Sequence, residues 1–203
     1  YAATQQRQAL VNTLHEVALG TEKGEEPRAS SKKKAVEALD AEFKQIASGY
    51  DRQVDGRLTT AGSQVDKAVA LLKEAVDAAK DPQTRQAAEL DLLTAQTLSA
   101  YIRSQHVVAA DAYAYTLATI ASRAKAVVPE RVEQYEATAK VVRSKQQELV
   151  SQATATIDAA RELASQISAA GQNERFAALA NEESRHLDQY RERLTNPASR
   201  TPE

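Results

Sequence analysis

The sequence predicts an all-α fold, namely an elongated antiparallel helical bundle of three long helices and two short ones. Apolar residues recur at steps of three and four over very long stretches, and this is the period of one face of an α-helix. Ala, Gln, Glu, Lys, Arg and Leu dominate the 203 residues, which include only two Phe and no Trp. That composition is typical of long helices with coiled-coil-like packing rather than of an α/β enzyme core.

Two helices are expected in the first part of the chain. Residues 3–19 read as a short amphipathic helix, and a polar loop with Gly and Pro follows over residues 20–28. The first long helix is expected over residues 31–80, with Ser30 or Ser31 as its N-cap. Its apolar positions advance by about 3.6 residues per step, which predicts a nearly straight helix.

Three glycines interrupt this first long helix, although an interior Gly costs about 1 kcal/mol relative to Ala. They are Gly49, Gly56 and Gly62. If the chain turns near residue 81, they lie at the levels of three large side chains of the next helix, Tyr113, His106 and Tyr101. One interpretation is that the glycines make room for these side chains. The other is a break in the helix near residues 49–56.

A second long helix is expected over residues 82–128. Asp81 and Pro82 are typical of an N-cap and a first helical residue. The packing face of this helix is the least regular of the three, because Thr94 and Gln105 fall on it.

Pro129 begins the third long helix, which is expected over residues 129–170. Gly171 is a good residue to end it, and Asn173 is a good cap for a short final helix. Short connections make consecutive helices antiparallel neighbours.

We therefore expect residues 1–196 to form a single elongated bundle and residues 197–203 a polar tail. The helix over residues 3–19 and the final helix together nearly match one long helix. We expect these two to share the fourth corner of the bundle, end to end.

Charge and composition exclude several classes of function. The formal net charge is −2 and the pI is about 6.0, whereas a nucleic-acid binder would show a basic excess. The chain has no Cys, which removes disulfides and thiolate metal sites. It also lacks an apolar run long enough to span a membrane. We expect no nucleic-acid partner, and membrane attachment only through an anchor beyond Glu203.

Few residues are candidates for chemistry. The predicted register places His15 far from His106 and His186, and each is expected to be a partly exposed polar residue. Glu183 and His186 form a single Glu-x-x-His pattern, whereas di-iron bundles need two copies. The segment with Asp111, Tyr113 and Tyr115 suits either a small-ligand pocket or the wet edge of a core, and we favour the latter. We expect no enzyme activity, no catalytic or metal site and no cofactor.

The chain has a recognisable pattern. It lacks Cys and Trp, and it combines a long helix over residues 31–80, turns at Pro82 and Pro129 and a polar tail over residues 196–203. It resembles the alanine-rich and glutamic acid/alanine-rich surface coat proteins of insect-stage trypanosomes. The resemblance implies a glycosylphosphatidylinositol-anchored rod that is densely packed on the cell and shields its membrane. The chain begins at Tyr1, so we expect a removed leader and a location at the cell surface or outside the cell.

Two other functions fit the pattern. One is an extracytoplasmic helical-bundle sensor domain that binds a small ligand, and the other is a phasin-like protein that coats granules. For a coat protein, we expect contacts with a vector or host surface receptor and weak lateral self-association. Loops carry such recognition. The candidate partner-contact loop contains Gly20, Glu22, Lys23, Glu25, Glu26 and Arg28.

Overall fold

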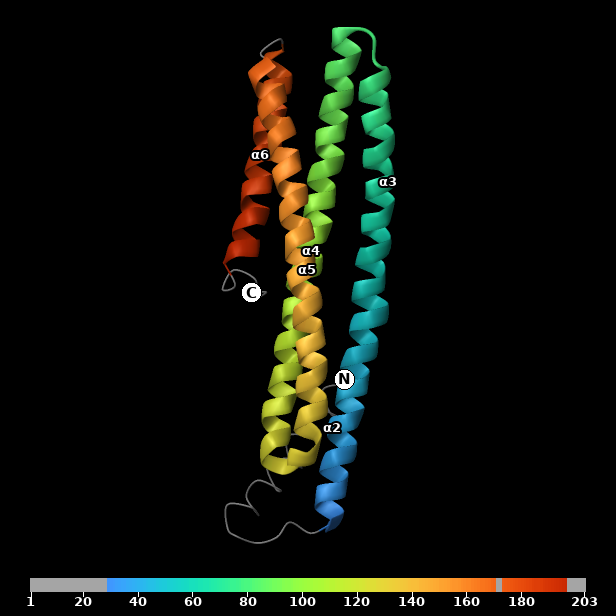
Figure 1. Ribbon diagram of the computed structural model, residues 1–203, viewed down its shortest axis with the longest axis vertical. Helices are drawn as coiled ribbons and strands as arrows, with labels where there is room; N and C mark the ends of the chain where they lie inside the picture. The colour runs from blue at the N-terminus through green and yellow to red at the C-terminus, as the bar shows by residue number, and fades with distance from the viewer. Residues whose placement is uncertain (1–28, 171–172, 197–203) are drawn as a thin grey trace. The chain divides into compact units, whose positions relative to one another are not determined.

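The computed structural model describes residues 29–170 and 173–196, and these residues form an all-α helical bundle without strands (Figure 1). The expected helix over residues 3–19, the loop over residues 20–28 and the tail over residues 197–203 lie outside this part. The described elements are α2 (Ala29–Gly49), η1 (Tyr50–Asp55), α3 (Gly56–Ala78), α4 (Pro82–Val127), α5 (Pro129–Ala170) and α6 (Glu174–Thr195).

The capping residues set the helix ends much as the sequence predicts. Helix α5 has the predicted bounds, and α4 ends one residue earlier than expected. The side chain of Asp81 accepts a hydrogen bond from the backbone N–H of Thr84 at 2.9 Å. Asn173 caps α6 by accepting one from the backbone N–H of Arg175 at 3.0 Å. Both caps satisfy an N–H that has no partner within its own helix.

The start of α2 differs from the prediction. Ser30 and Ser31 do not precede the helix but lie in its first turn, because α2 already includes Ala29. At the other end of the expected helix, α3 stops at Ala78, where the extended backbone of Ala79 terminates it.

A π-helical turn separates α2 from α3, and the sequence prediction missed it. The apolar positions Ile46, Tyr50, Val54 and Leu58 are three successive steps of four residues. At about 100° per residue, each step of four drifts by about 40° around an α-helix, so three steps move the stripe by about 120°. A π-helix has more residues per turn and absorbs this drift. The element η1 therefore keeps the chain helical where a break was considered.

The room-making interpretation of the glycines is wrong for the two positions that the structure tests. A Cβ atom added to Gly49 would meet nothing within 4 Å. One added to Gly62 would meet only Cγ2 of Ile102, at 4.0 Å, which is an ordinary contact. The predicted register is nevertheless nearly correct. Tyr50, beside Gly49, stacks on Tyr113 with ring centroids 4.2 Å apart.

The described residues divide into two compact units, and each has its own core. Unit 1 contains residues 29–53 and 112–144, and unit 2 contains residues 54–111 and 145–196 except 171–172. The expected single bundle over residues 1–196 stays a prediction.

In unit 1, the buried ring of Tyr135 lies 4.8 Å from that of Phe43. The Tyr135 hydroxyl donates to Asp40 at 2.7 Å and so links α5 to α2. The core of unit 1 contains Ala35, Leu39, Ile120, Ala121, Ala124, Val128 and Tyr135.

In unit 2, α4, α5 and α6 form a small-residue core. Many of its members are alanines, which let helices approach closely, and Leu and Ile fill the space between them. The antiparallel register of α5 and α6 shows in three successive pairs. Arg191 contacts Asp158, Arg161 contacts Asp188, and Ser168 donates to Asn181. The buried core residues are Leu93, Ala100, Val107, Ala153, Ile157, Ala160, Ala164, Ile167, Ala180, Leu187 and Leu194.

Candidate functional site

The interface of α3 with α4 in unit 2 is unusually polar. Helix α3 contains no buried residue. Helix α4 instead buries polar side chains, and those that share one helical face are Gln96, Ser99 and His106. Buried polar groups are costly unless they find hydrogen-bond partners.

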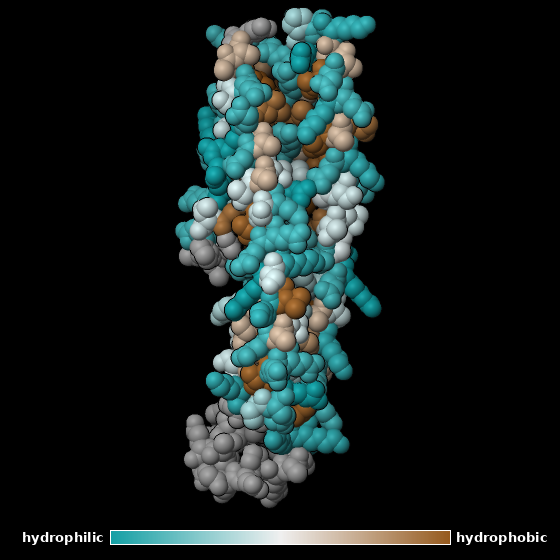
Figure 2. Space-filling model, viewed as in Figure 1, coloured by the Kyte–Doolittle hydropathy of each residue, from teal (hydrophilic) through white to brown (hydrophobic). Residues whose placement is uncertain are grey.

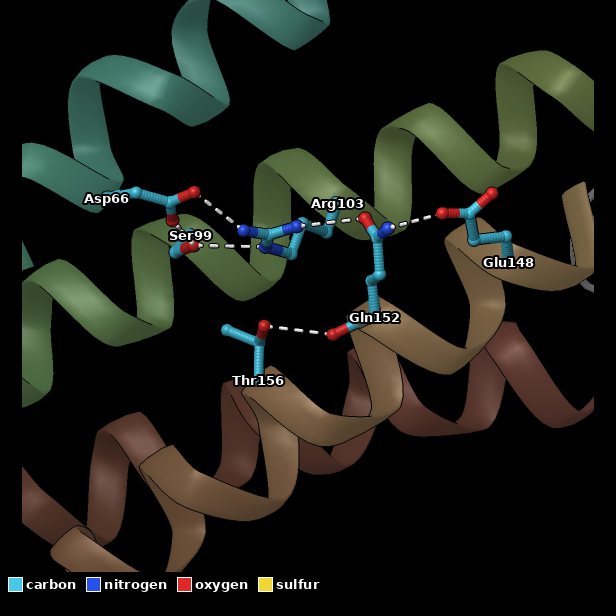
Figure 3. Close-up of polar contacts among 6 residues, drawn as sticks. All are labelled: Asp66, Ser99, Arg103, Glu148, Gln152 and Thr156. Carbon is cyan, nitrogen blue, oxygen red and sulfur yellow. Dashed lines mark hydrogen bonds and ion pairs between the residues drawn. The ribbon is translucent and has the colours of Figure 1, made fainter. Parts of the chain in front are cut away.

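Arg103 of α4 lies at the centre of a network that links three helices (Figure 3). Its Nη2 donates to Oδ2 of Asp66 on α3 at 2.7 Å, and its Nη1 donates to Oε1 of Gln152 on α5 at 3.2 Å. Ser99 donates to Oδ1 of Asp66 at 3.1 Å, and Gln152 donates to Glu148 at 3.2 Å. The network thus holds α3 and α5 against the same side of α4.

A second polar cluster is centred on Asp55, the last residue of η1. Its Oδ1 lies 2.8 Å from Nε2 of His106 on α4 and accepts from Nζ of Lys145 on α5 at 2.7 Å. Burial alone would raise the pKa of Asp55, but the hydrogen bonds from Lys145 and His106 outweigh burial and lower it.

Two expectations about the histidines can be compared with the structure. His106 is only 7% exposed, so the expectation of a partly exposed residue is wrong. Asp55 provides the buried ring with a hydrogen-bond partner, and this makes its burial tolerable. His186 is exposed, and its Nδ1 lies 3.8 Å from Glu183 one turn earlier on α6. His15 lies outside the described residues.

An open groove of about 490 Å³ lies beside the Arg103 network, between α3, α4 and α5. Leu58, Ile102 and Leu149 give it an aliphatic lining, and Arg103, Lys67 and His106 add polar groups. A smaller groove of about 260 Å³ adjoins it, since Asp66 lines both. The described helices of unit 2 therefore leave open grooves between them. Helix α3 packs too loosely to fill the space over the polar face of α4.

The tyrosines near Asp111 occupy different environments. Tyr113 is buried against Tyr50, and burial, followed by the charge of Asp51, raises its pKa. Tyr115 is 76% exposed. Asp111 accepts a hydrogen bond from Gln146 at 2.7 Å. The expectation of a solvent-exposed tyrosine at the edge of the core thus fits Tyr115 and does not fit Tyr113.

The sequence contains a signal for this site that the initial interpretation missed. Gln96, Ser99, Arg103 and His106 are spaced by three, four and three residues, which places them on one face of α4. A polar stripe with helical spacing on an otherwise packed helix indicates an interface with polar partners. Asp55 and Lys145 show no such pattern, because their partners come from distant parts of the chain.

Several expectations concern parts that the structure leaves open. The candidate partner-contact loop, Gly20, Glu22, Lys23, Glu25, Glu26 and Arg28, lies outside the described residues. Within residues 29–170 and 173–196, no group of three His, Cys, Asp or Glu side chains is arranged to hold a metal ion. No described helix is both long enough and apolar enough to cross a bilayer.

Comparison with protein-family models, with curated proteins and with solved structures gives no match for this chain.

Proposed function

We propose that this chain is a non-enzymatic structural protein of a cell-surface coat. The main support for this proposal is that its charged and polar side chains connect helices to one another. Arg103 and Asp55 each connect three helical elements, and the Tyr135 hydroxyl connects α2 to α5. An active site holds a nucleophile, acid or base ready beside the substrate. Here the best-placed polar groups instead fasten helices to one another.

The surface supports a coat role over a granule-coating role. The face in Figure 2 is mostly hydrophilic, with separated hydrophobic patches. A phasin-like protein would need a broad apolar stripe to cover a granule. The exposed large apolar side chains of the described residues are instead spread over four helices. They are Leu71, Leu98, Tyr101, Tyr115, Val141 and Leu179.

The resemblance to trypanosome coat proteins supports the cellular part of the proposal. A coat protein of that kind is held by a lipid anchor added beyond its folded part, which here would follow Glu203. It would shield the membrane and contact its neighbours only weakly. Hydrophilic helix faces with mixed charges suit such dense packing, because they disfavour tight self-association.

Surface labelling of intact cells that express the full-length gene product tests this proposal. The protein should react with a membrane-impermeant biotin reagent, and a phosphatidylinositol-specific phospholipase C should release it. A cytosolic protein in the same cells is the control for lysis. A protein that is labelled only after permeabilisation would contradict the coat role. One that is labelled but resists the lipase would contradict the lipid anchor alone.

A further inference from the structure

The groove between α3, α4 and α5 has an aliphatic lining to which all three helices contribute. Leu58 comes from α3, Ile102 from α4 and Leu149 from α5. Next to them, Gly62 leaves open space, because an added Cβ would contact only Ile102, at 4.0 Å. A packed interface would fill this space with a side chain. The volume of about 490 Å³ lies within the range of about 300–1,000 Å³ that is usual for ligand pockets.

The charges along the groove favour an anion. Arg103 and Lys67 both line it, and Asp66 is the only carboxylate among its described lining residues. Asp66 is already paired with Arg103 at 2.7 Å. The side chains of Asp66 and Arg103 are 48% and 25% exposed, so water reaches this ion pair and a second carboxylate can compete for Arg103. Arg103 contacts Asp66 through Nη2 alone, while its Nη1 donates to Gln152, so a ligand carboxylate would take over the Nη2 contact.

The adjoining smaller groove contains an unsatisfied polar group. Gln96 lines it and is 9% exposed, and its Oε1 is buried without a hydrogen-bond partner. Most buried polar atoms have a partner, so such an atom calls for an explanation. Asp66 separates the two grooves because it lines both. Because Oε1 of Gln96 only accepts hydrogen bonds, a carboxylate head cannot satisfy it, and such a head stays at Arg103.

We propose that this groove binds a small organic anion with a carboxylate head and an aliphatic body. The head takes the place of Asp66 on Arg103, and the body lies on Leu58, Ile102 and Leu149. No Phe, Tyr or Trp side chain of the described residues lines the groove, so an aliphatic body fits better than a large planar ring. This site goes beyond the coat role and does not depend on it.

The test uses the purified chain and octanoate as the probe, followed by methyl NMR and calorimetry. Octanoate should shift the methyl signals of Leu58, Ile102 and Leu149 in a saturable manner. Octylammonium has the same tail and the opposite charge, and acetate has the head without the tail. Both should bind at least about tenfold more weakly than octanoate. Equal binding of octylammonium, or no saturable shift at these methyls, would overturn the proposal.

Four variants separate binding from folding. Gly62→Leu fills the groove and should abolish octanoate binding, whereas the matched Gly62→Ala adds one methyl group and should retain it. Arg103→Gln removes the anchor for the head and should weaken binding at least about tenfold. Asp66→Asn removes the competing carboxylate and should strengthen binding. If Asp66 and Arg103 only hold helices together, this variant should bind octanoate no more tightly than the unchanged protein does.

The result is independent of the surface-labelling experiment. Failure of octanoate to bind leaves the phospholipase release unchanged, and a protein that is not at the cell surface still has the groove. The two proposals can therefore fail separately.

Discussion

The carboxylate of Asp55 lies 2.8 Å from Nε2 of His106, although the two residues are far apart in the sequence. Lys145 donates to the same oxygen at 2.7 Å. Asp55→Asn removes the charge that both partners face. We expect it to lower the free energy of unfolding by roughly 1–3 kcal/mol, because hydrogen bonds to charged groups are the strong ones. Urea denaturation measures this loss.

Asp51→Asn is the matched control for that variant. Asp51 lies in the same π-helical turn and is exposed. Its replacement should change stability by less than about 0.5 kcal/mol. Equal losses in the two variants would show that the Asp55 cluster contributes nothing specific.

Low pH should reduce the stability of the folded protein through Asp55. The pKa of Asp55 is lower in the folded protein than its ordinary value of 3.8, because hydrogen bonds from Lys145 and His106 outweigh the effect of burial. The unfolded state therefore takes up the proton first as pH falls. The stabilisation is complete above about pH 4 and is lost as pH falls through the folded pKa, below 3.8. In urea denaturations between pH 5 and pH 2, Asp55→Asn should flatten this part of the profile.

Tyr135→Phe tests the hydroxyl that connects α5 to α2 in unit 1. The ring packing against Phe43 stays, whereas the hydrogen bond to Asp40 at 2.7 Å is lost. Asp40 keeps its contact with Arg131 at 3.4 Å, so we expect a loss of about 1–2 kcal/mol in denaturant unfolding. Tyr115→Phe changes a residue that is 76% exposed and should have almost no effect. A neutral Tyr135→Phe would mean that packing alone holds this ring.

Gly49→Ala should stabilise the protein. The added Cβ meets nothing within 4 Å, and Ala is favoured over Gly in helices by about 0.5–1 kcal/mol. A higher midpoint of thermal unfolding checks this. A destabilised variant would instead support the interpretation in which the glycine makes room for a large neighbour.

The π-helical turn should be removable. Deleting the exposed Gln53 turns one of three successive steps of four into a step of three, so the apolar stripe fits an ordinary α-helix. NMR chemical shifts should then show continuous α-helix from α2 into α3, with a small change in stability. Deleting Ala61 within α3 turns every later residue of this helix by about 100°, separates Asp66 from Arg103 and should destabilise unit 2 more than the Gln53 deletion. Similar losses for both deletions would contradict this origin of η1.

Local signals made the helix boundaries predictable. Asp81, Pro129 and Asn173 act on the backbone beside them, so their effect depends little on the rest of the fold. The π-helical turn was missed because the spacing of apolar residues was averaged over the whole helix. That average of about 3.6 residues does not reveal three successive spacings of four. The Arg103 network was missed for a different reason. Its partners come from three helices, and a change of one residue in their register would separate them.

Helix α3 has a consequence for how unit 2 comes apart. It contributes no fully buried side chain, and Asp66 connects it to α4 through contacts that remain half open to water. Segments with so little buried surface open at a fraction of the global free energy. Amide protons of α3 should therefore exchange with deuterated solvent before those of α4. A protease that needs an unwound substrate would make its first cut in unit 2 within this helix.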